Sequence, residues 1–260
     1  MYSIIHMLLS DKKGGEIFTL FSAWHFFYIA LTVVAAVVPL FVSRNKNEDA
    51  KKKLCRLLSS VAFGLYVADF FLMPLAYHEI NVEKLPFHVC TAMCTMLFLS
   101  YRISYLEKFR TSFALLGFVS NLVYTIYPAG VMWHAVHPLS YRVVQTLLFH
   151  SLMCVCSLLT FVYERNRFER KALLRDVGVL VCMTLWALLG NYSYNHVTEE
   201  RTYFFNWFFV VRDPFNAFPE NVAPFIMPFL NFAMFFVAET IIYFTIISVK
   251  RINKKSISVN

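Results

Sequence analysis

The stretch IFTLFSAWHFFYIALTVVAAVVPLFV, Ile17–Val42, decides the fold class, because it is a long apolar run without Asp, Glu, Lys or Arg. A transmembrane helix needs about 20 consecutive, mainly apolar residues, and this stretch exceeds that length. The rest of the chain has the same character. Of its 260 residues, 58% are hydrophobic and only 15% are charged, and the mean hydropathy is +0.56. The sequence therefore predicts a polytopic membrane protein rather than a soluble domain.

Further stretches are apolar enough to cross a bilayer as helices. They are Leu54–Tyr77, Leu85–Tyr101, Phe109–Tyr127, Leu139–Tyr163, Leu173–Tyr194 and Val222–Val249. The second of these is short and the third is interrupted by polar residues, so we expect six or seven transmembrane helices. The connections between them are too short to hold a second domain. We therefore predict an all-α membrane helical bundle that forms a single integral membrane domain over residues 1–260.

The basic residues predict the orientation of this bundle. With seven helices, 18 of the 24 Lys and Arg fall on one side, in the connections after the first, third and fifth helices and in the C-terminal tail. By the positive-inside rule, the N-terminus lies outside and the C-terminus lies in the cytoplasm. We expect a multi-pass protein of the cell membrane. A nucleic-acid partner is not expected, because the basic residues are scattered through short loops without a domain that could bind a duplex.

Polar side chains inside the predicted helices indicate where a site lies, because each is costly in hydrocarbon and tends to face the bundle interior. Five of the helices place such groups in the predicted outer half of the membrane: His25, Asp69, His88, Cys90, Gln145, His150 and Asn191. Each also has a structural interpretation. A lone His or Asn often serves only as an interhelical hydrogen-bonding group, and a buried Cys often serves as a small apolar residue.

Several of these residues fall in segments that resemble one family. LPFHVC, Leu85–Cys90, resembles the signature LPLHLC, and YRVVQTLLFHSL, which begins at Tyr141, resembles the pattern FRxxQFFLxHGL. FSAWHFFYIAL, YTIYPAG and LLGNYSYNHV are similar to three further segments in the same order. The chain thus resembles the YwaF-like integral membrane family, which is related to the eukaryotic transmembrane protein 164 group. One position departs from the family, which often has Asp where this chain has Thr91.

The resemblance implies acyl transfer on membrane phospholipid, without a cofactor or metal, with Cys90 as the nucleophile and His150 as its base. The chemistry is consistent with this, since a buried thiol needs a neighbouring base to form the thiolate. His88 lies about 200° around the helix from Cys90, so we expect it to orient a partner such as Asp69 instead. Asp69 and His25 are expected to face the same cavity. Gln145 and Asn191 are uncharged donors that could stabilise an oxyanion.

Two other classes of function stay open. A transporter or proton relay could use Asp69, Glu239 and the histidines, because intramembrane acids often mark ion paths, although the chain shows no inverted repeat. A metal or haem site could use His25, His88 and His150, perhaps with Cys90, but no helix carries paired histidines and neither HExxH nor CxxC occurs. A retinal protein is excluded, because the last predicted helix contains no lysine for a Schiff base.

Overall fold

The computed structural model describes residues 11, 15–77, 82–132, 135–164, 170–197, 205–214 and 217–257, and every regular element within these ranges is a helix. The chain divides into two compact units, Met1–Arg167 and Phe168–Asn260. The expectation of one integral membrane domain stays a prediction. Each unit is described separately below.

The first unit contains the helices α2 to α8. Their bounds are α2 Ala23–Ser43, α3 Glu48–Tyr77, η1 Val82–Lys84, α4 Val89–Ser100, α5 Ser104–Glu107, α6 Arg110–Ile126, α7 Ala129–Met132 and α8 Tyr141–Tyr163. Side-chain oxygens cap the N-termini of the longest helices. Ser22 accepts from the backbone of α2, Asn47 from that of α3, and Ser140 from that of α8.

The prediction of an all-helical membrane bundle is confirmed, since six helices within the described residues are long and apolar enough to cross a membrane. They are α2, α3, α6 together with α7, α8 and, in the second unit, α9 and α10. The segment expected as the third span differs: its helix, α4, starts only at Val89 and has 12 residues. At 1.5 Å per residue it is about 18 Å long, which is short of the roughly 30 Å hydrocarbon core. The side of the membrane on which each end lies stays a prediction.

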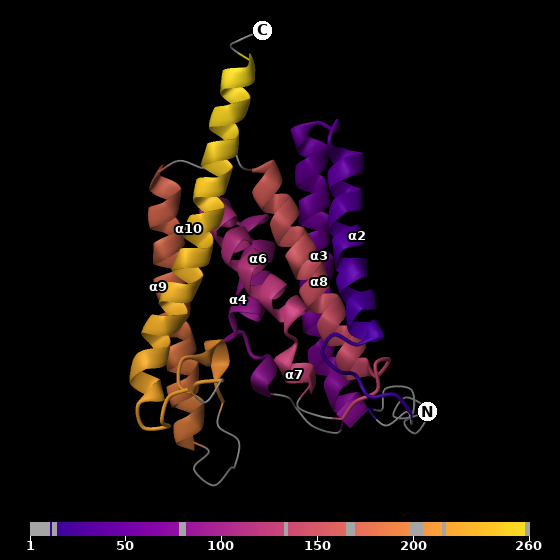
Figure 1. The fold of residues 1–260 in the computed structure, drawn as a ribbon, viewed down its shortest axis with the longest axis vertical. Helices are drawn as coiled ribbons and strands as arrows, with labels where there is room; N and C mark the ends of the chain where they lie inside the picture. Colours follow the sequence, from indigo (N-terminus) through magenta and orange to yellow (C-terminus); the bar gives the residue numbers. More distant parts are fainter. Residues whose placement is uncertain are drawn as a thin grey trace. The chain divides into compact units, whose positions relative to one another are not determined.

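Helix α8 lies at the centre of the first unit and α2 at its edge. In the most apolar 18-residue stretch of each helix, 72% of the residues of α8 are buried, but only 17% of the residues of α2. Figure 1 shows α2, α3 and α8 side by side, and α8 also packs on α6. Along the α2–α8 contact, the Tyr28 hydroxyl donates to the Pro138 carbonyl at 3.1 Å, and the Thr32 and Ser151 hydroxyls are 2.6 Å apart. The two helices are therefore parallel and held in register.

Helix α4 runs in the same direction as α8. Near its start, Lys84 pairs with Asp69, which also accepts from Tyr141 at the beginning of α8. At its other end, the hydroxyl of Tyr101 lies 2.9 Å from that of Thr160, near the end of α8. These contacts at both ends place α4 alongside α8, and α4 also packs on α3 and α6.

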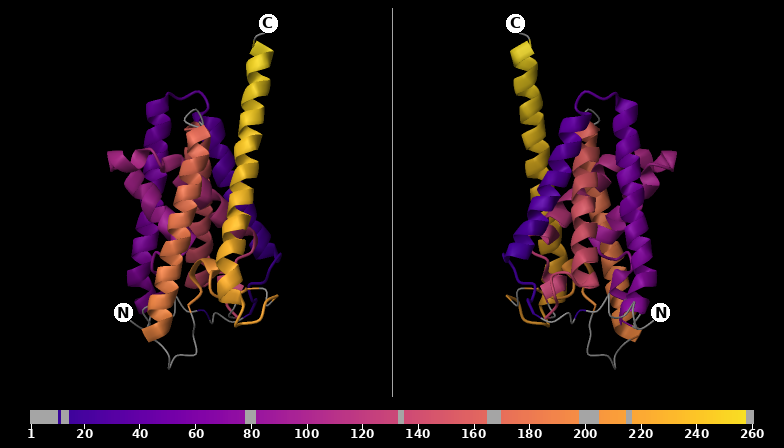
Figure 2. Two further views of the ribbon diagram at one scale, coloured as in Figure 1. Left: turned by 90° about the vertical axis from the view of Figure 1, so that its left-hand side faces the viewer. Right: turned by 90° about the vertical axis from the view of Figure 1, so that its right-hand side faces the viewer.

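The second unit is formed by α9, Arg170–Val197, η3, Trp207–Phe209, and α10, Ala223–Ile257. Figure 2 shows α9 and α10 running alongside each other. The connection between them folds back against α9, where Trp207 is buried. Phe208 and Phe209 both have positive φ, of 58° and 51°, and the side-chain amide of Asn231 donates to both of their carbonyls.

Candidate functional site

Cys90 is the second residue of α4 and therefore lies in its first turn. No side chain caps this helix, and its first helical hydrogen bond runs from the Ala92 N–H to the His88 carbonyl. The backbone N–H groups of the first turn thus have no partner within the helix. Such groups stabilise a thiolate and can donate to an oxyanion. The Ser120 side chain on α6 lies near the thiol of Cys90.

His150 is buried in the middle of α8, and its ring orientation is fixed by two neighbours. Its Nδ1 lies 2.7 Å from the Asn121 Oδ1, and its ring stacks on that of Tyr124 with 3.7 Å between centroids. The Asn121 Nδ2 donates to the Gly117 carbonyl at 2.7 Å, so Oδ1 is the acceptor and His150 Nδ1 carries the proton. Nε2 of the neutral ring is then the basic nitrogen. Among the described residues, Nε2 makes no hydrogen bond.

Cys90 and His150 lie at the same level along the two parallel helices. Tyr101 and Thr160 are hydrogen-bonded and mark a common level. A helix rises about 1.5 Å per residue. Cys90 therefore lies about 16 Å from Tyr101 towards the start of α4, and His150 lies about 15 Å from Thr160 towards the start of α8. Helix α4 contacts α8 directly, and both pack on α6.

Two consecutive residues of α6, Ser120 and Asn121, lie between α4 and α8 near the thiol and the imidazole. Ser120 lies near the Cys90 thiol and donates to the Gly117 carbonyl at 3.1 Å. Asn121 bonds the His150 ring, and the Asn121 Nδ2 lies 3.4 Å from the Ser120 hydroxyl. A cysteine, a histidine and an asparagine that orients the histidine are the elements of one known type of nucleophilic site. Asn121 was not among the candidate residues predicted from the sequence. The signal that could have found it is a carboxamide inside the polar-interrupted fourth predicted span.

Asp69 was expected to be a partner of His88, but its two contacts are with Tyr141 and Lys84. Its Oδ1 accepts a hydrogen bond of 2.6 Å from the Tyr141 hydroxyl, and its Oδ2 lies 2.8 Å from the Lys84 Nζ. Asp69 is 1% exposed, so this buried carboxylate is balanced by the ammonium of Lys84. Neither of these contacts involves His88, which is the N-cap residue of α4. Lys84, which sequence analysis did not single out, lies close enough to act electrostatically on both His88 and His150.

The side chain of His25 is fully engaged in connecting α2 to α6. Its Nδ1 accepts from the Phe21 N–H at 3.0 Å, and its Nε2 lies 3.0 Å from the Thr125 carbonyl. Because a backbone N–H can only donate, Nδ1 is the acceptor and Nε2–H is the donor. His25 is 0% exposed. Its observed role is therefore structural, and it supplies neither a free lone pair nor a free proton.

Gln145 and Asn191 were expected as oxyanion donors. Gln145 precedes His150 by five residues, about 140° around α8, so the two side chains leave the helix on different faces. Asn191 belongs to the second unit. Its Nδ2 donates to the Trp207 carbonyl and its Oδ1 accepts from the Trp207 N–H, both at 2.8 Å. Its carboxamide thus holds the α9–α10 connection, and the first-turn N–H groups of α4 are the better candidates for oxyanion donors.

No group of three or more His, Cys, Asp or Glu side chains suitable for a metal ion occurs among the described residues.

The sequence pattern of the TMEM164 family matches residues 20–249, which covers most of the chain. No curated protein and no solved structure matches it. The chain therefore belongs to the TMEM164 family and is a multi-pass membrane protein. The matched range includes every residue of the candidate site.

Proposed function

We propose that this TMEM164-family protein is a membrane-embedded acyltransferase that moves acyl chains between phospholipids through a thioester on Cys90. The observation that carries the proposal is the orientation of His150. Asn121 holds the proton on Nδ1, so the lone pair of Nε2 is available at the level of the Cys90 thiol. A base positioned in this way is what a half-buried thiol such as that of Cys90 requires to become a nucleophile.

The first half-reaction transfers the acyl chain to the enzyme. His150 Nε2 takes the thiol proton of Cys90, and the thiolate attacks the ester carbonyl carbon of a phospholipid. The resulting oxyanion is stabilised by N–H groups in the first turn of α4, a contribution of about 10²–10³ in rate for one donor. The tetrahedral intermediate collapses to a thioester, and His150 returns the proton to the leaving lysophospholipid alkoxide.

The second half-reaction reverses these roles. His150 removes the proton of an acceptor hydroxyl, whose oxygen attacks the thioester carbonyl, and the cysteine thiolate leaves and regains the proton from His150. A lysophospholipid acceptor gives transfer, whereas water gives hydrolysis. The membrane supplies both lipids to the bundle directly, which is consistent with a site inside helices rather than in a soluble domain.

The test compares variants in lipid vesicles that contain an isotope-labelled acyl donor and a lysophospholipid acceptor, with the products measured by mass spectrometry. Cys90→Ser replaces the thiol with a hydroxyl that is a far weaker nucleophile here, so transfer should be lost while the protein still folds. Cys94→Ser is the matched control, since Cys94 is buried one turn further along α4 and has no assigned role. Full transfer by Cys90→Ser would refute the proposal.

A transport function is the second candidate, and it is favoured by two buried acids in the second unit. Asp176 on α9 is 2% exposed and Glu239 on α10 is 1% exposed. Intramembrane carboxyl groups often mark proton or ion paths. If the protein is a transporter, Glu239→Gln should abolish a proton or cation flux into vesicles while Cys90→Ser leaves that flux unchanged.

A further inference from the structure

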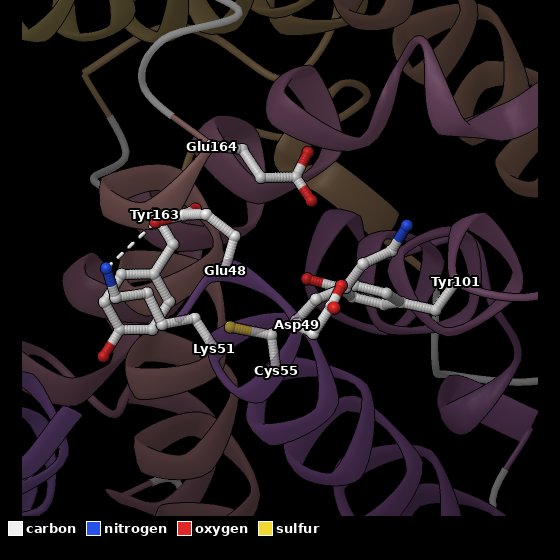
Figure 3. Close-up of a pocket in the computed structure, with 8 residues that line it drawn as sticks. Glu48, Asp49, Lys51, Cys55, Tyr101, Tyr163 and Glu164 are labelled. Carbon is white, nitrogen blue, oxygen red and sulfur yellow. Dashed lines mark hydrogen bonds and ion pairs between the residues drawn. The ribbon is translucent and has the colours of Figure 1, made fainter. Parts of the chain in front are cut away.

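A cavity of about 290 Å³ lies in the first unit at the opposite end of α4 from Cys90. Figure 3 shows the side chains that surround it, which come from the first turns of α3 and from the ends of α4 and α8. Its deepest residues are Cys55, which is 1% exposed, and Tyr101, whose hydroxyl is bonded to Thr160. This cavity contains none of the residues assigned to the acyl-transfer site.

Three carboxylates line the cavity: Glu48, Asp49 and Glu164. Two of them have basic partners, since Glu48 lies 3.0 Å from the Lys51 Nζ and Glu164 lies 2.7 Å from the Arg110 guanidinium. Asp49 lies next to Glu48 on α3. It makes no hydrogen bond or ion pair with any described residue. The acidic wall can therefore accept hydrogen bonds from a cationic group of a ligand.

The cavity also carries basic groups, Lys51 and Lys52. The Lys52 side chain is 50% exposed, and its Nζ lies 3.5 Å from Glu107, a long contact that leaves other ammonium protons available. A ligand that matches both walls carries an anionic group and a cationic group close together. A phosphate ester joined to an amine has this arrangement.

The two tyrosine rings in the wall distinguish between kinds of amine. Quaternary ammonium groups are recognised mainly by aromatic faces. In this cavity the Arg110 guanidinium already lies over the Tyr101 ring, 4.2 Å from its centroid, and the Lys51 ammonium lies 5.8 Å from that of Tyr163. A primary ammonium, in contrast, donates three hydrogen bonds and matches a wall of carboxylates. The cavity therefore favours a primary amine over a trimethylammonium group.

The position of the cavity along α3 corresponds to the headgroup layer of a bilayer. Helix α3 has 30 residues and is about 45 Å long, so it exceeds a hydrocarbon core of roughly 30 Å by about 15 Å. Its excess length includes the charged first turns that line the cavity. Leu57, a turn further along, is 60% exposed, and Phe41 at the end of α2 is 65% exposed, as lipid-facing side chains would be.

We propose that this cavity binds the phosphoethanolamine headgroup of a membrane aminophospholipid, with Asp49 and its neighbouring carboxylates receiving the ammonium and Lys52 receiving the phosphate. The site is separate from the acyl-transfer site and does not depend on the chemistry proposed there. By the distribution of basic residues, it faces the cytoplasmic leaflet.

Native mass spectrometry of the full chain in detergent tests the proposal by counting bound lipids during titration with phosphatidylethanolamine or phosphatidylcholine of the same acyl chains. We expect phosphatidylethanolamine to bind at least about 10-fold more tightly. Asp49→Asn should bring this preference close to one, and Lys52→Gln should weaken both lipids. Lys53→Gln is the matched control, because Lys53 is adjacent on α3 but does not line the cavity.

A soluble arm uses glycerophosphoethanolamine, which has the same headgroup without acyl chains. We expect it to displace the lipid only at concentrations far above the lipid's own dissociation constant, because the acyl chains also contact the lipid-facing helices. Binding of the soluble ester as tightly as the lipid would overturn the membrane lipid as the occupant. Equal binding of both lipids, unchanged by Asp49→Asn and Lys52→Gln, would overturn the site itself.

Discussion

Replacing Asn121 tests the proposed role of His150 without altering either reacting group. In Asn121→Ala, the Nδ1–H of His150 loses its acceptor at 2.7 Å in a buried position. An unpaired buried donor costs about 1–3 kcal/mol. The ring can avoid this cost by moving its proton to Nε2, but Nε2 then cannot accept the thiol proton. At 1.36 kcal/mol for each factor of ten in rate, we expect acyl transfer to fall about 5- to 150-fold.

A second substitution separates this effect from a loss of packing. Asn121 also donates through Nδ2 to the Gly117 carbonyl, a contact within α6 that stabilises the helix rather than the histidine. Asn121→Asp loses that donor, as Asn121→Ala does, but keeps an oxygen that can accept from His150. The two variants should therefore have similarly reduced thermal stability, whereas Asn121→Asp should transfer acyl chains faster than Asn121→Ala.

The assay is the initial rate of labelled acyl transfer in vesicles at equal amounts of folded protein, with thermal unfolding followed on the same preparations. Equal rates for the wild type and Asn121→Ala would show that His150 needs no orienting acceptor. Equal losses in Asn121→Ala and Asn121→Asp, matching their losses in stability, would show that Asn121 contributes only to packing.

Three further predictions concern the scaffold. His25→Leu leaves the Phe21 N–H and the Thr125 carbonyl unpaired, at about 1–3 kcal/mol each, so the unfolding temperature should fall, whereas an unchanged value would contradict a structural role. Asn191→Leu releases Trp207, so protease cleavage between α9 and α10 should accelerate, and an unchanged cleavage pattern would count against this role. A reporter fused to the C-terminus should be active only in the cytoplasm, and activity outside would reverse the predicted topology.

The sequence predicted the helices well, because long charge-free runs such as that of α2 leave few alternatives in a membrane. It was less informative about where a helix begins. The apolar run starts at Leu85, but α4 begins only at Val89, and this start places Cys90 in a first turn whose N–H groups have no acceptor within the helix. A proline at position 86, whose ring disfavours helical geometry in the residue before it, is the physical cue in hindsight.

Partners across helices could not be read from the sequence, because they depend on helix rotation and register. Asn121 is one of several polar residues in α6, and only the packing of α6 against α8 directs it to His150. The same holds for Lys84 and Asp69, which come from different helices. For His25 and Asn191, the sequence correctly indicated costly polar groups. The structure shows that both are engaged with backbone groups, which no residue pattern distinguishes from a reactive site.

The most direct test of the central claim is detection of an acyl thioester on Cys90. Vesicles containing the protein and a phospholipid donor, without acceptor, are stopped with acid, and the peptide that contains Cys90 is analysed by mass spectrometry before and after treatment with neutral hydroxylamine. We expect an acyl mass on Cys90 that hydroxylamine removes, strongly reduced in His150→Gln and absent in Cys90→Ser. Acyl transfer at the wild-type rate with no acyl group on Cys90 would exclude Cys90 as the nucleophile.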